Sequence, residues 1–210
     1  MPFHFINFAI RTFKRQKMYT AVTVIGLSLA LGASLLILSF VNYELNFEKC
    51  HDRAERTYRV GGAWQQDDLI VYMKAAMYPL GPAMKEALPE IEQQVRLRQY
   101  KDLSVKADHD REYRADKFLL ADPEIFDVFT VQLVSGNPQT ALSRPHSVVV
   151  SEQAARNLFG DVNPLGRTLT IRDTVMLTVT GVMADLPLNT QIHTDFLASF
   201  TTFEVSGVVP

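Results

Sequence analysis

The 210-residue sequence contains a single cysteine, Cys50, and none of the short motifs that mark the common catalytic sites. One cysteine cannot form an internal disulfide, and we expect its thiol to have a structural role. The absence of a G-x-x-x-x-G-K-[ST] segment excludes a P-loop for ATP, and no G-x-S-x-G elbow is present. The sequence therefore predicts no catalytic residue and no bound cofactor.

Histidines with the spacing of metal ligands are also lacking. No H-x-x-x-H or C-x-x-C pair occurs. Of the five histidines, His51, His109, His146 and His193 lie far apart in the chain. Isolated histidines of this kind are typical of surfaces and turns, so we expect no metal site.

Acidic residues are absent before Glu44, and charge of either sign is absent from residues 18–43. As a helix, this apolar run would be roughly 39 Å long, more than the hydrocarbon core of about 30 Å. A cleaved signal peptide is the alternative, since "ALGAS" at 30–34 offers a small-x-small site. The run continues through "LLILSFV" without a break, which favours a transmembrane anchor over residues 18–43.

Four basic residues precede this run with no acid beside them: Arg11, Lys14, Arg15 and Lys17. They predict a cytoplasmic N-terminus and place everything from residue 44 onward outside the cytoplasm. Apolar residues in the same stretch recur at helical spacing, so residues 1–17 are predicted to form an amphipathic helix at the inner membrane face. The rest of the chain has 17 basic and 23 acidic residues, so it lacks the excess of basic residues that is typical of a nucleic-acid-binding domain.

Beyond residue 55 the apolar residues alternate with polar ones, as in half-buried strands. Three such strands are predicted over 94–100, 167–171 and 175–182, with 172–174 as a hairpin connection between the last two. In the third strand the alternation predicts one buried face: Val175, Leu177 and Val179.

Helices are predicted between and after these strands. The segment "GPAMKEALPE" has Pro82 in its first turn, and its apolar stripe consists of Met84, Ala87 and Leu88. The segment "HSVVVSEQAARNLFGD" reads as a strand followed by a helix, with Ser151 as the N-cap and Gly160 as the stop. These elements predict an α+β domain with a mixed or antiparallel sheet, in two lobes.

Five segments, in order, resemble the opening of ABC-transporter permeases of the FtsX/MacB type. They cover roughly residues 10–200 and read "YELNFEKCHDRAERTYRV", "PLGPAMKEALPEIEQQVRL", "DPEIFDVFTVQLVSGNPQTAL", "SVVVSEQAARNLFGDVNPLGRTL" and "LTVTGVMADLPLNTQIHTDFLASF". Many members have Y-E-x-x-[FY]-[DE]-x-x-H just after the first span. Cys50 departs from that pattern, because an aromatic or apolar residue usually stands there.

The resemblance implies an organisation in which the first helix leaves the membrane as a stalk and a MacB-like periplasmic core domain follows. We expect the stalk or connector over 44–54, the core domain over 55–206 and a truncated end at 207–210. Residues at the membrane exit and on the stalk would be Tyr43, Glu44, Leu45 and Phe47. Tyr58 and Val60 are expected to start the first strand.

The same resemblance implies a non-catalytic permease subunit in a bacterial inner membrane, with its main domain in the periplasm. A separate cytoplasmic ABC ATPase would hydrolyse ATP, and the stalk would carry the motion outward by mechanotransmission. A second permease copy or homologue and a periplasmic adaptor would be further partners. Family permeases return to the membrane through at least three more helices, so we expect this chain to be an N-terminal fragment. The alternative is a single-pass anchored binding or sensor module outside the cytoplasm.

Overall fold

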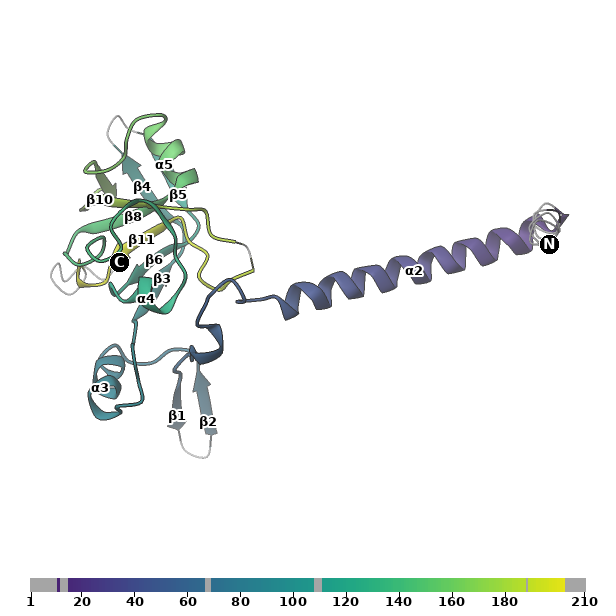
Figure 1. The fold of residues 1–210 in the computed structure, drawn as a ribbon, viewed down its shortest axis with the longest axis horizontal. Helices are drawn as coiled ribbons and strands as arrows, with labels where there is room; N and C mark the ends of the chain where they lie inside the picture. The colour runs from purple at the N-terminus through teal and green to yellow at the C-terminus, as the bar shows by residue number, and fades with distance from the viewer. Residues whose placement is uncertain (1–10, 12–14, 67–68, 108–110, 188, 203–210) are drawn as a thin grey trace. The chain divides into compact units, whose positions relative to one another are not determined.

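The computed structural model describes residues 11, 15–66, 69–107, 111–187 and 189–202, and the chain forms two compact units, residues 1–47 and 48–210. The first unit contains helix α2 (Lys17–Leu45), none of whose side chains is buried (Figure 1). It is the one helix in the described part of the chain that is long and apolar enough to cross a membrane, with a mean hydropathy of 2.4. The span predicted over 18–43 lies within it.

Helix α2 ends where Asn46 bonds back to the preceding turn. The Nδ2 group of Asn46 donates to the carbonyl oxygen of Asn42 at 2.7 Å, and its backbone N–H donates to the same oxygen at 3.2 Å. Turns follow over residues 46–53, and then a short 3₁₀ helix, η1 (Ala54–Arg56). Helix α2 therefore ends within the stalk or connector expected over 44–54, and residues 46–53 of that range form turns.

The second unit contains a large lobe (residues 95–202) built on a nine-stranded sheet with the order β3-β6-β11-β8-β10-β9-β4-β5, and β7 pairs with β10. Strand β10 runs parallel to β8, and β11 runs parallel to β6, whereas the other pairs are antiparallel. The sheet is therefore mixed, as predicted. The strands are β3 (Leu97–Tyr100), β4 (Leu103–Ala107), β5 (Glu112–Ala115), β6 (Phe118–Ala121), β7 (Leu133–Gly136), β8 (Ser147–Ser151), β9 (Thr168–Ile171), β10 (Val175–Met183) and β11 (Phe196–Ser199).

Both faces of the central strands are buried, and each face has its own apolar core. On β8, Val148 and Val150 join one core, whereas Val149 points into the other, and all three are fully buried. The first core is covered by helix α5 (Glu152–Phe159), and the second includes Ile125 of helix α4 (Ile125–Val128). Burial on both faces explains why β8 reads as a continuous apolar run in the sequence.

The predicted boundaries around α5 and the β9–β10 hairpin are confirmed. Ser151 Oγ accepts a hydrogen bond from the backbone N–H of Ala154 at 3.1 Å, and Gly160 ends the helix with φ +66°. Between β9 and β10 the chain turns through Arg172 and Asp173, both with positive φ. Leu177 and Val179 are each about 1% exposed, as the alternation predicted.

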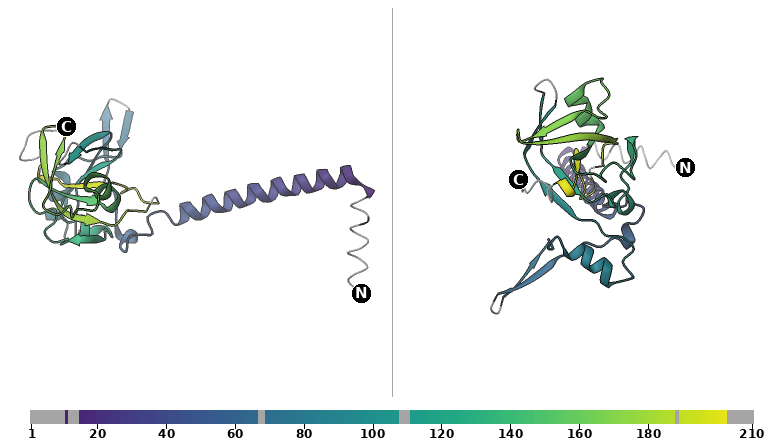
Figure 2. Two further views of the ribbon diagram at one scale, coloured as in Figure 1. Left: turned by 90° about the horizontal axis from the view of Figure 1, so that it is seen from above. Right: turned by 90° about the vertical axis from the view of Figure 1, so that its left-hand side faces the viewer.

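The small lobe (residues 57–90) consists of a two-stranded hairpin and one short helix, apart from the large sheet (Figure 2). Its elements are β1 (Gly62–Gln66), β2 (Leu69–Met73) and α3 (Leu80–Ala87). The first strand thus begins after Tyr58 and Val60, which are exposed and do not start it. Helix α3 is where it was predicted, but none of its residues is fully buried: Met84 is partly buried, and Leu88 is 44% exposed.

Tyr78 of the small lobe contacts the large lobe. Its ring meets Phe200 edge-on at 5.2 Å between centroids, and the guanidinium of Arg98 lies 5.6 Å from the Tyr78 ring. On the large lobe, Arg96 lies 4.2 Å over the Phe200 ring and bonds through Nε and Nη2 to the buried carboxylate of Asp122. Aromatic and cation–π contacts thus connect the two lobes at this point.

Candidate functional site

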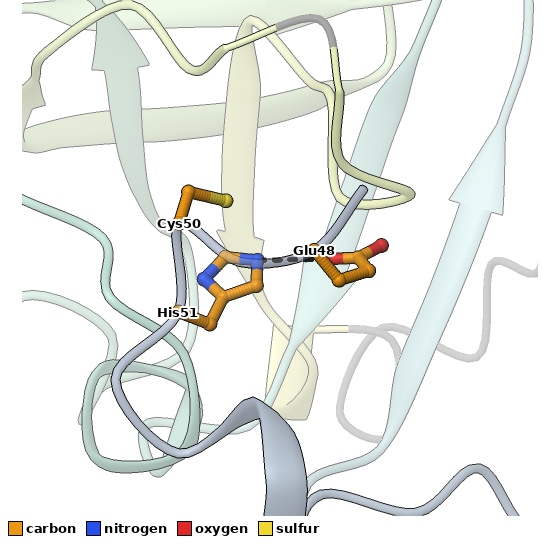
Figure 3. A group of neighbouring side chains, drawn as sticks. All are labelled: Glu48, Cys50 and His51. Carbon is orange, nitrogen blue, oxygen red and sulfur yellow. Dashed lines mark ion pairs between the residues drawn. The ribbon is translucent and has the colours of Figure 1, made fainter. Parts of the chain in front are cut away.

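In the first turn of the second unit, the side chains of Glu48, Cys50 and His51 lie close to one another (Figure 3). One potential ligand atom from each of Glu48, Cys50 and His51 lies within 4.8 Å of the others. Two residues, Asn46 and Phe47, separate this cluster from the last residue of α2. We call Glu48, Cys50, His51 and Thr190 the clamp, because their contacts hold the start of the unit to a distant loop.

His51 lies in a turn, as predicted, but it is buried and not on the surface. The residue is 6% exposed, and its ring meets Phe129 edge-on at 5.2 Å. The backbone N–H of Thr130 donates to Nδ1 at 3.2 Å, and Nε2 lies 3.0 Å from Thr190 Oγ1 and 3.2 Å from Glu48 Oε2. Because a backbone N–H can only donate, Nδ1 holds a lone pair and a neutral ring carries its proton on Nε2.

Glu48 accepts hydrogen bonds from the loop that begins at Asn189. Its carboxylate accepts one from Thr190 Oγ1 at 2.8 Å and one from the backbone N–H of Gln191 at 2.6 Å. The backbone N–H of Glu48 in turn donates to the carbonyl oxygen of Asn189 at 2.9 Å. Glu48 has φ +63°, a strained conformation for a residue with a side chain, and these three bonds hold it there.

The donors and acceptors of the clamp form a consistent chain. The Nε2–H of His51 donates toward Thr190 Oγ1, and the hydroxyl of Thr190 donates to the Glu48 carboxylate. Thr190 is itself buried, at 4% exposed. Hydrogen bonds to a charged acceptor in such a place contribute about 1.5–3 kcal/mol each, and a partner left unpaired there costs a similar amount.

Cys50 completes the cluster with a free thiol that is only partly exposed. Burial raises the pKa of the Cys50 thiol, and the nearby Glu48 carboxylate raises it further. The thiol is therefore protonated at neutral pH and is a poor nucleophile and metal ligand. The structural role expected for Cys50 stays a prediction.

A Glu, Cys and His donor set would suit zinc, but the arrangement opposes metal binding. A metal on Nε2 of His51 would require the proton to move to Nδ1, which already accepts from Thr130. It would also require loss of the Cys50 proton against a raised pKa. The geometry fits a hydrogen-bonded anchor better than a metal centre.

The membrane-exit residues predicted from the sequence all lie in the first unit. Tyr43 and Phe47 meet edge-on, with ring centroids 6.2 Å apart, as their spacing of four residues allows. Glu44 and Leu45 are the last two residues of α2 and are exposed. The role of these side chains at a membrane interface stays a prediction.

The basic residues predicted at the inner face are only partly described. Arg11 and Arg15 are exposed, and Lys17 is the first residue of α2. Lys14 and most of the amphipathic helix predicted over 1–17 lie outside the described residues, as does His109. Their role as anchors stays a prediction.

The clamp itself was not predicted as a site. The only sequence signal was the [DE]-x-x-H spacing of Glu48 and His51 within the segment that carries the resemblance. Their partners Thr130 and Thr190 lie far along the chain, and a lone threonine in a loop carries no signal of its own.

Comparisons with known proteins agree with this architecture. The chain resembles a domain assigned to a permease protein of Porphyromonas gingivalis, with 29% identity and a TM-score of 0.57 over 67% of this chain and 60% of that one. The periplasmic region of MacB from Actinobacillus actinomycetemcomitans matches at 19% identity and a TM-score of 0.44, over 59% of this chain and 56% of that one. The extracellular domain of the ABC-type transporter YknZ from Gram-positive bacteria matches at 18% identity and a TM-score of 0.42, over 58% and 63%.

No curated protein sequence matches the chain. The chain spans about 60% of the length of the Porphyromonas domain. The sequence model of the MacB-like periplasmic core domain matches residues 20–209, which is nearly the whole chain. The chain therefore belongs to the family with the MacB-like periplasmic core domain.

Proposed function

We propose that this chain is a permease part of an ABC transporter that couples a separate cytoplasmic ATPase to an extracytoplasmic domain. Family membership supports the transporter context. The observation that carries the coupling is the clamp, which is separated from the end of α2 by Asn46 and Phe47 alone. A pull or turn of the helix would reach the clamp through this very short connector.

The clamp suits this task because it resists separation from the domain. Glu48 bonds to three consecutive residues of one loop, and His51 bonds to that loop and to Thr130. Force arriving at Glu48 would therefore be shared between two parts of the large lobe. A freely hinged connector would lose the same motion in backbone rotation.

Energy for transport would come from a partner, because the chain lacks a phosphate-binding loop. The proposed location is a bacterial inner membrane, with the N-terminus in the cytoplasm and residues 48–210 in the periplasm. One span cannot enclose a translocation path, so the helix would work together with other spans, from a second permease copy or from sequence beyond these residues. The interpretation of this chain as an N-terminal fragment, and a role for a periplasmic adaptor, stay predictions.

The test is affinity purification of the tagged chain from its native membranes, followed by an assay of magnesium-dependent ATP hydrolysis. We expect an ATPase subunit with a P-loop to co-purify, and the chain purified alone to hydrolyse no ATP. An anchored binding or sensor module would purify without an ATPase, which would contradict the proposal. Hydrolysis by the chain alone would contradict its non-catalytic role.

A further inference from the structure

An open pocket of about 470 Å³ lies where the small lobe meets the loop that follows Asn189. It is lined by Arg59, Gly61 and Lys74 from the small lobe and by Gln191 from the large lobe. A pocket of this size is in the range of about 300–1,000 Å³ that small-molecule ligands occupy.

In the part of the chain that the structure describes, neither cation of this pocket has an acidic partner. Arg59 donates from Nε to the carbonyl oxygen of Lys74 at 3.0 Å and from Nη1 to Gln191 Oε1 at 3.4 Å, so both of its acceptors are neutral. Among the described residues, no carboxylate lies within 4.0 Å of the charged nitrogens of Arg59 or Lys74. The other basic side chains with such a partner include Arg56, Arg96, Lys106, Arg114 and Arg156.

The backbone beside the pocket brings residues 59–61 close to the end of β2. A Cβ atom at Gly61 would lie 2.6 Å from the carbonyl oxygen of Met73, so the strand end that carries Lys74 can approach only because Gly61 has no side chain. The two bonds of the Arg59 guanidinium fix its plane and leave N–H groups to donate elsewhere. The Arg59 guanidinium is suited to the oxygens of a carboxylate or a phosphate, and Lys74, which also lines the pocket, carries a second positive charge.

We propose that this pocket binds a small-molecule oxyanion, either a carboxylate or a phosphate, between Arg59 and Lys74. One further step of this inference, the effect of the ligand on coupling through the clamp, rests on the proposed function. Gln191 accepts from Arg59 through its side chain, and its backbone N–H donates to the Glu48 carboxylate at 2.6 Å. A ligand that fixes Arg59 and Gln191 therefore also steadies the loop to which the clamp is bonded.

Calorimetric titration of the full chain in neutral detergent tests the site. The probes are inorganic phosphate, dihexanoylphosphatidylglycerol, acetyl-tetraalanine with a free carboxylate, and the same peptide with a carboxamide end. We expect saturable binding of at least one anionic probe, no binding of the carboxamide, and weaker binding as sodium chloride is raised. Binding of free phosphate, of the lipid or of the peptide carboxylate identifies the source of the oxyanion.

Two variants and a matched control locate the binding. Arg59→Gln and Lys74→Gln should each lower the affinity by about tenfold or more, because each removes a charged donor. Arg144→Gln removes an exposed cation away from the pocket and should leave the affinity unchanged. Circular dichroism of each variant should match the wild-type spectrum.

Absence of saturable binding by every anionic probe would overturn the proposal, as would equal affinity in all three variants. Hydrogen exchange tests the link to the clamp, since a bound anion should slow exchange of the Glu48 and Gln191 amides. Unchanged exchange at those amides with a bound anion would overturn that link. Co-purification of an ATPase does not depend on the anion, so the absence of anion binding leaves the proposed function standing. The absence of co-purification would leave the anion site standing and would remove only its link to coupling.

Discussion

In the large lobe, β10 buries Leu177 and Val179 to about 1% exposure, whereas in the small lobe all five residues of β2 remain exposed although they are just as apolar. The difference lies in what covers each strand. Strand β10 has neighbours on both sides and two apolar cores, while β2 pairs with β1 alone in the described part of the chain. An apolar strand is buried only where a second layer is available to pack on it.

The same difference in packing predicts that the small lobe is less stable than the large lobe. An isolated two-stranded hairpin is at best marginally stable in water, so the small lobe depends on its contacts with other parts of the molecule. Amides of β1 and β2 should therefore exchange with solvent much faster than those of β8, β10 and β11.

The same change in the two lobes should have very different effects. Val179→Asp would place a carboxyl group without a partner in the core and should lower the free energy of unfolding by about 4 kcal/mol or more. Val71→Asp on β2 and Met176→Asp on the exposed face of β10 should each cost less than about 1 kcal/mol. Thermal unfolding of the full chain in detergent measures this, and similar costs at Val179 and Val71 would refute the contrast.

The next largest loss of stability is expected when the buried ion pair between Arg96 and Asp122 is broken, near the contact between the lobes. Arg96→Met would leave the Asp122 carboxylate, whose side chain is 5% exposed, without its guanidinium and should cost about 3 kcal/mol. Asp122 would keep the backbone N–H of Arg96 as a donor, at 2.9 Å. Arg114→Met, which alters an exposed pair 3.7 Å apart, is the control and should cost less than about 1 kcal/mol. Equal melting temperatures for the two variants would show that the Arg96 pair adds nothing.

The clamp should contribute less than the core but more than the surface around it. His51→Leu keeps most of the buried volume and removes both ring hydrogen bonds, so it should cost about 2 kcal/mol. Exchange should also become faster at the Glu48 and Thr130 amides. Lys49→Ala, in the same turn but exposed, is the control and should leave both quantities unchanged. A His51→Leu variant as protected as wild type would mean that the network does not hold the connector.

The smallest effect on stability is expected from the ionisation of Tyr113 at high pH. Burial, with the hydrogen bond to Asp195, raises the pKa of Tyr113 to about 12 from its ordinary 10. The folded protein therefore keeps this proton between pH 10 and 12 while the unfolded chain loses it, so stability falls as the pH rises through that window. Tyr113→Phe should make the melting temperature fall less steeply between those two pH values. An identical slope in wild type and Tyr113→Phe would contradict the raised pKa.

The elements that sequence alone predicted are those with strong local signals. Helix α2 follows from a long uncharged run, and the strand, cap and stop around α5 follow from Val148 to Gly160. Strands β6 and β11, each four residues long, were not predicted, because four apolar residues in a row do not distinguish a strand from a helix. The exposure of β2 and α3 was also beyond reach, since it depends on neighbours that local patterns do not encode.

The clamp shows the same limit at the level of function. His51 was expected in a turn or at the surface because no second ligand lay at a suitable spacing in the sequence. Its burial comes from Phe129, Thr130 and Thr190, which only the fold brings together.

The position at which α2 ends decides what a proline substitution near its C-terminus can test. Leu45→Pro would shorten the last turn of the helix and would not kink a longer stalk, so it is a weak test of coupling.

The most direct test inserts two glycines between Asn46 and Phe47, which lengthens the connector and leaves the helix and the clamp intact. ATP turnover would be measured for the ATPase that co-purifies with the chain, with a matched two-glycine insertion between Asp161 and Val162, an exposed turn, as the control. Coupling through the connector predicts that the first insertion changes turnover to the value of the ATPase without the chain, while the control keeps the wild-type value. Wild-type turnover with both insertions would contradict coupling through the connector.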